Sequence, residues 1–273
     1  YGFTPTYGRV SRYGLIDYAN SMDKIGVMAK DIEDIALMLE IISGYDENDS
    51  TSVDIEVPKF TEKNKNRQQE LKVAGVKESL NVEAAKNIKI DFEVVSLPLT
   101  FKYSIPVYYL ISMSEASTNL AKFCGIRYGA QDILEGNFNE YFSNVRSKYL
   151  SKEEKRRIIL GTFARMAGFR EAYYIKALKV RTKIIQEYKE VFKKYDIIIT
   201  PSMPNIAPKF SEIDKMSPLE NYMMDIMTTG PNLAGFPHLS IPNGFIKGMP
   251  TGMLAIADHF QEQKLIDFAR RIK

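Results

Sequence analysis

The chain has 273 residues, of which 45% are hydrophobic and 26% charged, and these values are typical of a soluble globular protein with one large domain or two small ones. Its 37 basic and 34 acidic side chains give a formal charge of +3, which argues against a direct nucleic-acid binder, because such proteins usually carry a basic stripe. The single cysteine, Cys124, excludes an internal disulfide framework and is typical of a reducing cytoplasm, and no apolar run approaches the roughly 20 residues that span a bilayer.

The N-terminal part is predicted to be loop followed by one helix. Residues 1–29 are punctuated by glycines, which favour turns. In the stretch KDIEDIALMLEIISG, apolar residues recur at helical spacing from Ile32 to Leu39. Asp31 fits the N-cap and Gly44 the C-terminal cap of this helix.

Two short strands are predicted after a linker. The polar stretch TEKNKNRQQE, residues 61–70, is the best linker candidate. The Val-rich runs LKVAGV and FEVVSLP fit a pleated, half-buried surface and predict strands. The connection between them, at about 77–92, leaves little room for a full helix.

From Val107 the pattern becomes strongly helical and then returns to strands. Residues 151–195 predict one or two long helices, in which Gly161 and Gly168 mark a close helix contact or a kink. The later segments predict a buried strand, a pair of strands and a last helix: DIIITPSMP, PHLSIPNG, GMPTGMLAIADHF and EQKLIDFARRI. Strands and helices without strict alternation predict an α/β fold with a mixed β-sheet core covered by helices.

Several familiar catalytic and binding patterns are absent from this sequence. It contains no phosphate-binding P-loop, no strand-to-helix G-x-G-x-x-G and no G-x-S-x-G nucleophile elbow. The histidines, His238 and His259, are not at metal-ligand spacing, so no metal site is predicted.

Three polar side chains in apolar surroundings form a candidate binding set. Tyr108 lies at a helix start, Arg157 directly precedes the apolar run IILGTF, and Asp225 is flanked by methionines. A buried charge is costly unless it is paired, and pattern alone favours structural ion pairs. The same three groups can also hold a free amino acid, with the guanidinium on its carboxylate and the acid on its ammonium.

Several long stretches resemble one known family. TPTYGRVSRYGLIDYANSMDKIG, SEASTNLAKFCGIRYG, KRRIILGTFARMAGFREAYYIKALKVRT and NLAGFPHLSIPNG are similar to the amidase-signature enzymes, and among them to the A subunits of glutamyl-tRNA(Gln), or aspartyl/glutamyl-tRNA, amidotransferases. The resemblance covers nearly the whole chain. It implies that residues 1–273 are the C-terminal part of a single amidase-signature domain, with a helix-rich substrate-pocket portion at about 105–195.

The resemblance also implies a function. An A subunit of this kind is a glutaminase in a heterotrimeric, cytoplasmic ligase with B and C subunits. It releases ammonia from glutamine for the conversion of Glu-tRNA(Gln) to Gln-tRNA(Gln). No cofactor is expected in the glutaminase, whereas the B subunit uses ATP and Mg and is the main contact for the misacylated tRNA. Asparagine as the donor and Asp-tRNA as the acceptor stay open.

Matching the motifs assigns the candidate residues. Arg157 is expected to bind the α-carboxylate of glutamine, Asp225 its α-ammonium, and Tyr108 to add a hydrogen bond; Arg156 is the alternative to Arg157 if the register shifts by one. The family's Ser nucleophile, cis-Ser and Lys are expected upstream of Tyr1. No catalytic residue is therefore predicted in this chain, and the chain alone is expected to be inactive.

Two other hypotheses remain at this point. One is a naturally shortened, non-catalytic paralogue that acts as a scaffold for a B-type partner. The other is a stand-alone amidase of the same superfamily.

Overall fold

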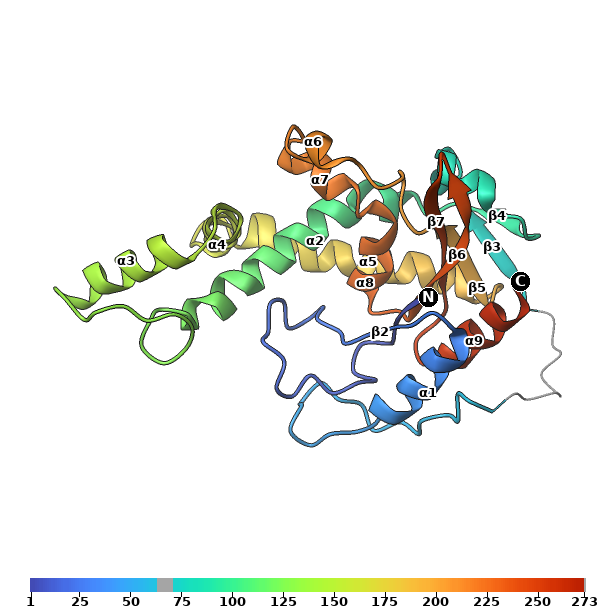
Figure 1. The fold of residues 1–273 in the computed structure, drawn as a ribbon, viewed down its shortest axis with the longest axis horizontal. Coiled ribbons are helices and arrows are strands. Elements are labelled where there is room, and N and C mark those ends of the chain that lie inside the picture. Colours follow the sequence, from blue (N-terminus) through green and yellow to red (C-terminus); the bar gives the residue numbers. More distant parts are fainter. Residues whose placement is uncertain (63–70, 273) are drawn as a thin grey trace. The chain divides into compact units, whose positions relative to one another are not determined.

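The computed structural model describes residues 1–62 and 71–272, and the chain divides into two compact units (Figure 1). The predicted linker at 61–70 lies almost entirely outside the described residues. The first unit comprises Tyr1–Leu15, Lys24–Ile105 and Arg181–Lys273, and the second Ile16–Asp23 and Pro106–Val180.

The first unit contains a seven-stranded mixed sheet in the described residues, with strand order β2-β1-β6-β7-β5-β3-β4. Its strands are β1 (Gly2–Thr4), β2 (Val27–Met28), β3 (Val73–Val76), β4 (Glu93–Val95), β5 (Ile197–Pro201), β6 (His238–Ile246) and β7 (Met249–Ile256). β3 pairs in parallel with β4 and β5, and the other neighbouring strands pair antiparallel. This arrangement confirms the predicted α/β fold with a mixed sheet.

Strand β5, which lies between β7 and β3, is buried along its whole length. Its isoleucines alternate between the faces of the sheet, and Ile197 and Ile199 join a core with helices α1 (Ile32–Ile42) and α9 (Glu262–Arg271). These two helices lie side by side (Figure 1). The structure thus confirms the predicted buried strand and both predicted helices.

The ends of α1 follow the predicted pattern closely. The Asp31 carboxylate accepts a hydrogen bond from the Glu33 amide at 2.7 Å, as an N-cap does. The helix ends one residue earlier than expected, because Ser43 is the C-cap. Gly44 follows at φ 141°, and its amide donates to the Arg9 carbonyl.

The first unit also holds parts of α2 (Pro98–Asn119) and α5 (Lys176–Phe192), with α6 (Phe210–Ile213), α7 (Pro218–Met223) and α8 (Ile226–Ala234). Gly230 of α8 packs closely, since a Cβ there would lie 2.7 Å from Thr100 Cγ2 and 2.7 Å from the Tyr188 hydroxyl.

Between β3 and β4 the described chain forms two 3₁₀ turns, η1 (Lys77–Ser79) and η2 (Glu83–Asn87). The expected lack of a full helix there is confirmed.

The second unit is mainly helical within its described residues. Its helices are the rest of α2, η3 (Leu120–Lys122), α3 (Phe138–Tyr149), α4 (Lys152–Arg165), the π-helical turn η4 (Glu171–Ile175) and the start of α5, and the non-helical segment Ile16–Asp23 belongs to the same unit. A capping box between Ser151 and Glu154 begins α4. The helical stretch then breaks after Arg165, where Gly168 has φ 86°. In the described part of the chain, no helix is long and apolar enough to cross a membrane.

Candidate functional site

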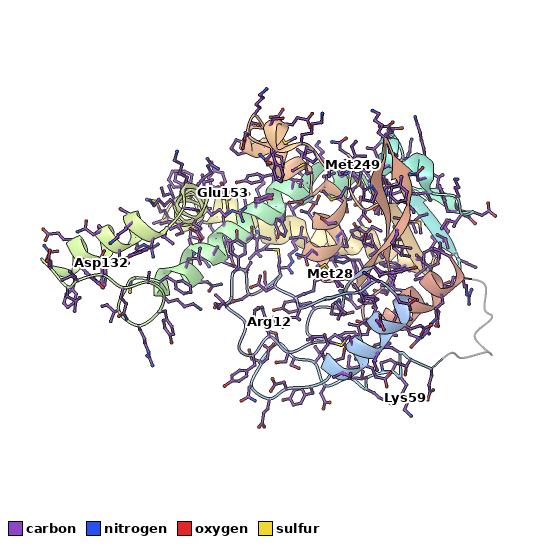
Figure 2. The ribbon with its side chains drawn as sticks, in the orientation of Figure 1. Arg12, Met28, Lys59, Asp132, Glu153 and Met249 are labelled. Atoms are coloured by element: carbon purple, nitrogen blue, oxygen red, sulfur yellow. The ribbon has the colours of Figure 1, made fainter. Side chains whose placement is uncertain are left out.

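Arg157 is held in place by two side chains of the second unit. It lies on α4, and its Nε donates to Glu153 Oε1 at 2.8 Å, one turn earlier on the same helix; Figure 2 labels Glu153. Its Nη1 donates to the hydroxyl of Tyr18 at 2.8 Å. The guanidinium carbon is 5.6 Å from the centre of the Tyr18 ring and 5.9 Å from that of Tyr109. The Arg157 side chain therefore lies close to two aromatic rings, with 28% of its surface exposed.

This environment favours the charged form of Arg157. Burial opposes the charge, but the hydrogen bond to Glu153 and the interaction with the Tyr18 hydroxyl outweigh it, so the pKa of Arg157 lies above its usual value. A permanently charged guanidinium with part of its surface exposed can bind a carboxylate. The neighbouring Arg156 is more exposed, at 44%, and pairs with the other oxygen of the same carboxylate, Glu153 Oε2.

Tyr108 is connected to the surroundings of Arg157 through the ring of Tyr109. It is half-buried on α2, and its ring meets that of Tyr109 edge to face, with the centroids 5.2 Å apart. Tyr109 in turn faces Arg157. The structure thus brings Tyr108 and Arg157 into one aromatic cluster of the second unit.

Asp225 belongs to the first unit. It is the half-buried N-cap residue of α8, and its carbonyl accepts hydrogen bonds from the amides of Thr228 and Thr229 at 3.0 Å. It therefore lies directly before α8. A carboxylate at this end is favoured by the helix dipole.

Basic side chains surround the other end of α8. Arg181 Nε donates to the Leu233 carbonyl at 2.7 Å, and Lys24 Nζ donates to the Phe236 carbonyl at 3.1 Å. Burial, together with repulsion from Arg181, outweighs the attraction of Glu262 and lowers the pKa of Lys24 to about 7. Nothing in the sequence SMDKIG marks this lysine as partly buried, so no sequence pattern predicts its position.

The two histidines have structural partners. His238 Nδ1 lies 3.1 Å from the Phe236 carbonyl, and His259 Nε2 lies 3.0 Å from the Ala234 carbonyl. Burial and the Lys24 charge lower the pKa of His238 to about 3, and burial also lowers that of His259. Among the described residues, no group of three or more His, Cys, Asp or Glu side chains could hold a metal ion.

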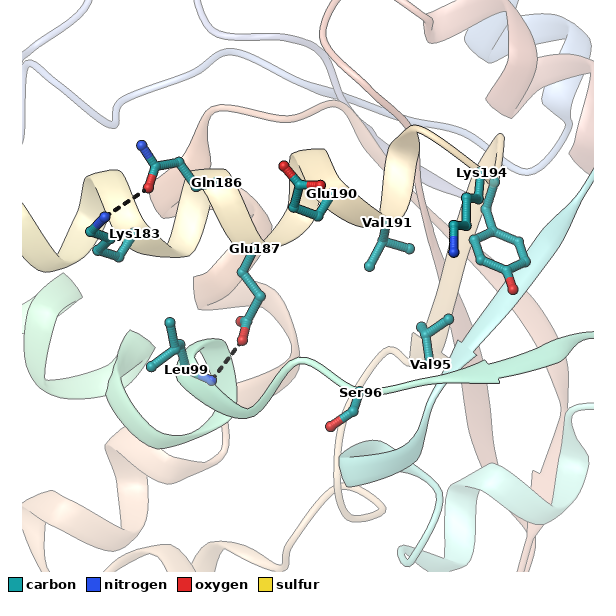
Figure 3. Close-up of a pocket in the computed structure, with 10 residues that line it drawn as sticks. Val95, Ser96, Leu99, Lys183, Gln186, Glu187, Glu190, Val191 and Lys194 are labelled. Carbon is teal, nitrogen blue, oxygen red and sulfur yellow. Dashed lines mark hydrogen bonds between the residues drawn. The ribbon is translucent and has the colours of Figure 1, made fainter.

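A separate open pocket of about 800 Å³ lies on the first unit (Figure 3). It is lined mainly by residues of α5 and of the segment that joins β4 to α2. Its carboxylate Glu187 caps the start of α2, accepting from the amides of Leu99 and Thr100 at 2.9 and 2.8 Å. None of the residues predicted to bind glutamine lines this pocket.

Comparison with known proteins decides the family. Residues 1–266 match the family model described as amidase. The chain belongs to the amidase family. Its relatives in this family include the A subunit of the glutamyl-tRNA(Gln) amidotransferase of Archaeoglobus fulgidus, 45% identical over 99% of this chain, and that of Carboxydothermus hydrogenoformans, 43% identical over 98%. The chain spans 60% and 58% of the lengths of these two proteins.

Solved amidase structures show the same fold. The A subunit of the glutamyl-tRNA(Gln) amidotransferase of Thermotoga maritima is 35% identical, with a TM-score of 0.73 over 99% of this chain and 57% of its own. A 6-aminohexanoate cyclic dimer hydrolase is 16% identical, with a TM-score of 0.72 over 98% of this chain and 58% of its own. The hydrolase supports the fold alone.

Proposed function

We propose that this chain is the glutamine-binding part of the glutaminase component, of the A type, of a tRNA-dependent amidotransferase, which releases ammonia from glutamine. The observation that carries the proposal is the state of Arg157, which is charged, held by hydrogen bonds to Glu153 and Tyr18, and still partly exposed. The identity of 43–45% to A subunits of glutamyl-tRNA(Gln) amidotransferases, over almost the whole chain, supports the choice among amidases.

The three candidate residues suit a free amino acid. Arg157 binds its α-carboxylate, because a guanidinium offers several N–H donors in one plane. Asp225 pairs with the α-ammonium, and Tyr108 adds a hydrogen bond. The half-buried position of Tyr108 and Asp225 supports these roles, because partial exclusion of water strengthens polar contacts.

We assign amide cleavage itself to residues outside this sequence, following the family resemblance. In this proposal residues 1–273 belong to a single amidase-signature domain, and the helix-rich portion at about 105–195 supplies much of the substrate pocket. The B and C subunits complete a cytoplasmic heterotrimer, and the B subunit binds ATP, Mg and most of the tRNA. Glutamine is the proposed donor and Glu-tRNA(Gln) the proposed acceptor.

Reconstitution tests this function. The natural protein that contains this sequence is purified with and without its B and C subunits, and ammonia release and Gln-tRNA(Gln) formation are measured with glutamine as the donor. We expect ATP-dependent formation of Gln-tRNA(Gln) only in the complete assembly. Strong glutaminase activity without B and C would instead identify a stand-alone amidase, and assembly without any ammonia release would identify a scaffold.

A further inference from the structure

Tyr18 is anchored independently of Arg157. Its amide donates to Asp23 Oδ2 at 2.8 Å, and its carbonyl accepts from Asn119 Nδ2 of α2 at 2.9 Å. One residue earlier, Asp17 forms an ion pair with Lys122. These contacts, all within the second unit, fix the backbone of the segment that carries the Tyr18 ring.

The same segment is attached to α2 at a second point. The amide of Ser21 donates to Glu115 Oε2 at 2.9 Å. Three side chains of α2 and the turn after it therefore hold residues 17–21 through backbone or ionic contacts. The Tyr18 hydroxyl is thereby presented at a set place rather than on a freely moving loop.

Glu153 and Tyr18 occupy different nitrogens of Arg157. Glu153 takes Nε and Tyr18 takes Nη1, while the described residues provide no hydrogen-bond partner for Nη2. Two hydrogen bonds on different nitrogens, together with the covalent attachment at Cδ, fix the plane of a rigid guanidinium. The remaining N–H groups are therefore aimed in one direction.

We propose that Tyr18 is a positioning residue for the glutamine site, whose hydroxyl acts with the Glu153 carboxylate to orient Arg157 so that the free N–H groups meet the α-carboxylate. This inference rests on the proposed function. The orientation is set before the substrate arrives, which reduces the conformational freedom lost on binding.

The competing explanation is that Tyr18 only ties its segment to α4. A tie of that kind affects stability, and through stability it affects every ligand equally. A positioning role affects only ligands that carry the α-carboxylate. Binding measurements with two ligands, one with and one without the α-carboxylate, therefore distinguish the two explanations.

The experiment uses the natural protein that contains this sequence and measures Kd by calorimetry for L-glutamine and for its α-amide, which lacks the carboxylate. Tyr18→Phe is expected to weaken L-glutamine about tenfold, because a hydrogen bond to a charged group is lost. The Kd of the α-amide is expected to stay within about twofold. In an Arg157→Ala background, Tyr18→Phe is expected to have no further effect. Tyr13→Phe, at a tyrosine 71% exposed in the same N-terminal region, is the matched control and is expected to change neither Kd.

The results separate this inference from the proposed function. If the wild type binds L-glutamine but Tyr18→Phe leaves its Kd unchanged, or weakens both ligands equally, Tyr18 is not a positioning residue and the proposed function stands. If the wild type binds no glutamine, the proposed function fails and the inference fails with it. Should Tyr18→Phe not fold, Glu153→Gln must show the same loss, selective for L-glutamine, for the positioning role to hold.

Discussion

Gly161 of α4 faces the carbonyl of Met113 of α2 so closely that a Cβ would lie 1.9 Å from that oxygen and 2.4 Å from its carbon. The two helices therefore touch backbone to backbone. One turn earlier on each helix lie Arg157 and Tyr109, whose guanidinium carbon and ring centre are 5.9 Å apart. The contact at Gly161 thus sets the spacing at the candidate carboxylate site.

Gly161→Ala is expected to disrupt this contact. The added methyl group meets backbone atoms that cannot rotate away, so α4 must shift against α2, at a cost of about 3 kcal/mol. The shift also moves Arg157, so the KM for glutamine is expected to rise. Chemical denaturation and steady-state glutaminase assays on the natural protein measure the two effects.

Gly168→Ala is the matched control for that substitution. Gly168 has no atom within 4 Å of an added Cβ, but its φ of 86° strains any other residue by about 1–2 kcal/mol. We expect a small loss of stability and an unchanged KM. A loss for Gly161→Ala no larger than for Gly168→Ala would contradict the expected cost of the close contact between α4 and α2.

Sequence patterns predicted those parts of the structure that depend on local order. The periodicity from Ile32 to Leu39 predicted α1, and the two apolar runs around a Gly/Pro loop predicted β6 and β7. Both glycines of the long helical stretch were predicted to matter, but a pattern could not tell that Gly161 marks the close contact and Gly168 the break.

The contacts around the candidate site were harder to predict. Glu153 precedes Arg157 by four residues on a predicted helix, and that spacing is a usable signal. Tyr18 is 139 residues away from Arg157 in the sequence, and no local pattern in LIDYANSM connects the two. Only the folding of residues 17–21 onto α2 brings the hydroxyl to the guanidinium.

His238 is expected to make the protein acid-sensitive. Burial and the Lys24 charge lower its pKa to about 3, against about 6.5 in an unfolded chain. Between these values the unfolded state binds more protons, so stability is fully present above pH 6.5 and is lost as the pH falls. From pH 6.5 to 5 this contribution falls by about 2 kcal/mol, which denaturation at a series of pH values measures.

His238→Asn is the variant that tests this assignment. The amide nitrogen of asparagine can replace Nδ1 as the donor to the Phe236 carbonyl, which lies 3.1 Å away, but it takes up no proton. The pH dependence of stability between 6.5 and 5 is expected to flatten in this variant. An equally steep dependence would assign the acid sensitivity to other groups.

Lys24 is expected to make the stability of the protein rise with pH in the alkaline range. Its folded-state pKa of about 7 lies below the value of about 10.4 in an unfolded chain, so the unfolded state binds more protons between these values and stability rises with pH. Lys24→Gln keeps a donor for the Phe236 carbonyl and removes the titration. From pH 7 to 9 the free energy of unfolding of the wild type is expected to rise by about 1 kcal/mol relative to this variant. The rise is no larger because solvent reaches the partly exposed lysine and screens part of the effect. Parallel stability curves for the two proteins would contradict the assignment.

Arg157→Ala tests the carboxylate site directly, with Arg156→Ala as its neighbour control. Arg157 lies close to two tyrosine rings and is hydrogen-bonded to Tyr18, whereas Arg156 is 44% exposed and pairs only with Glu153 among the described residues. Removing a partly buried charged partner of the substrate costs about 2–5 kcal/mol, so the KM for glutamine is expected to rise at least about thirtyfold in Arg157→Ala. Loss of an exposed ion pair costs at most about 1 kcal/mol, so Arg156→Ala is expected to keep a KM within a few-fold of the wild type. A large rise in Arg156→Ala together with an unchanged KM in Arg157→Ala would move the carboxylate contact to Arg156.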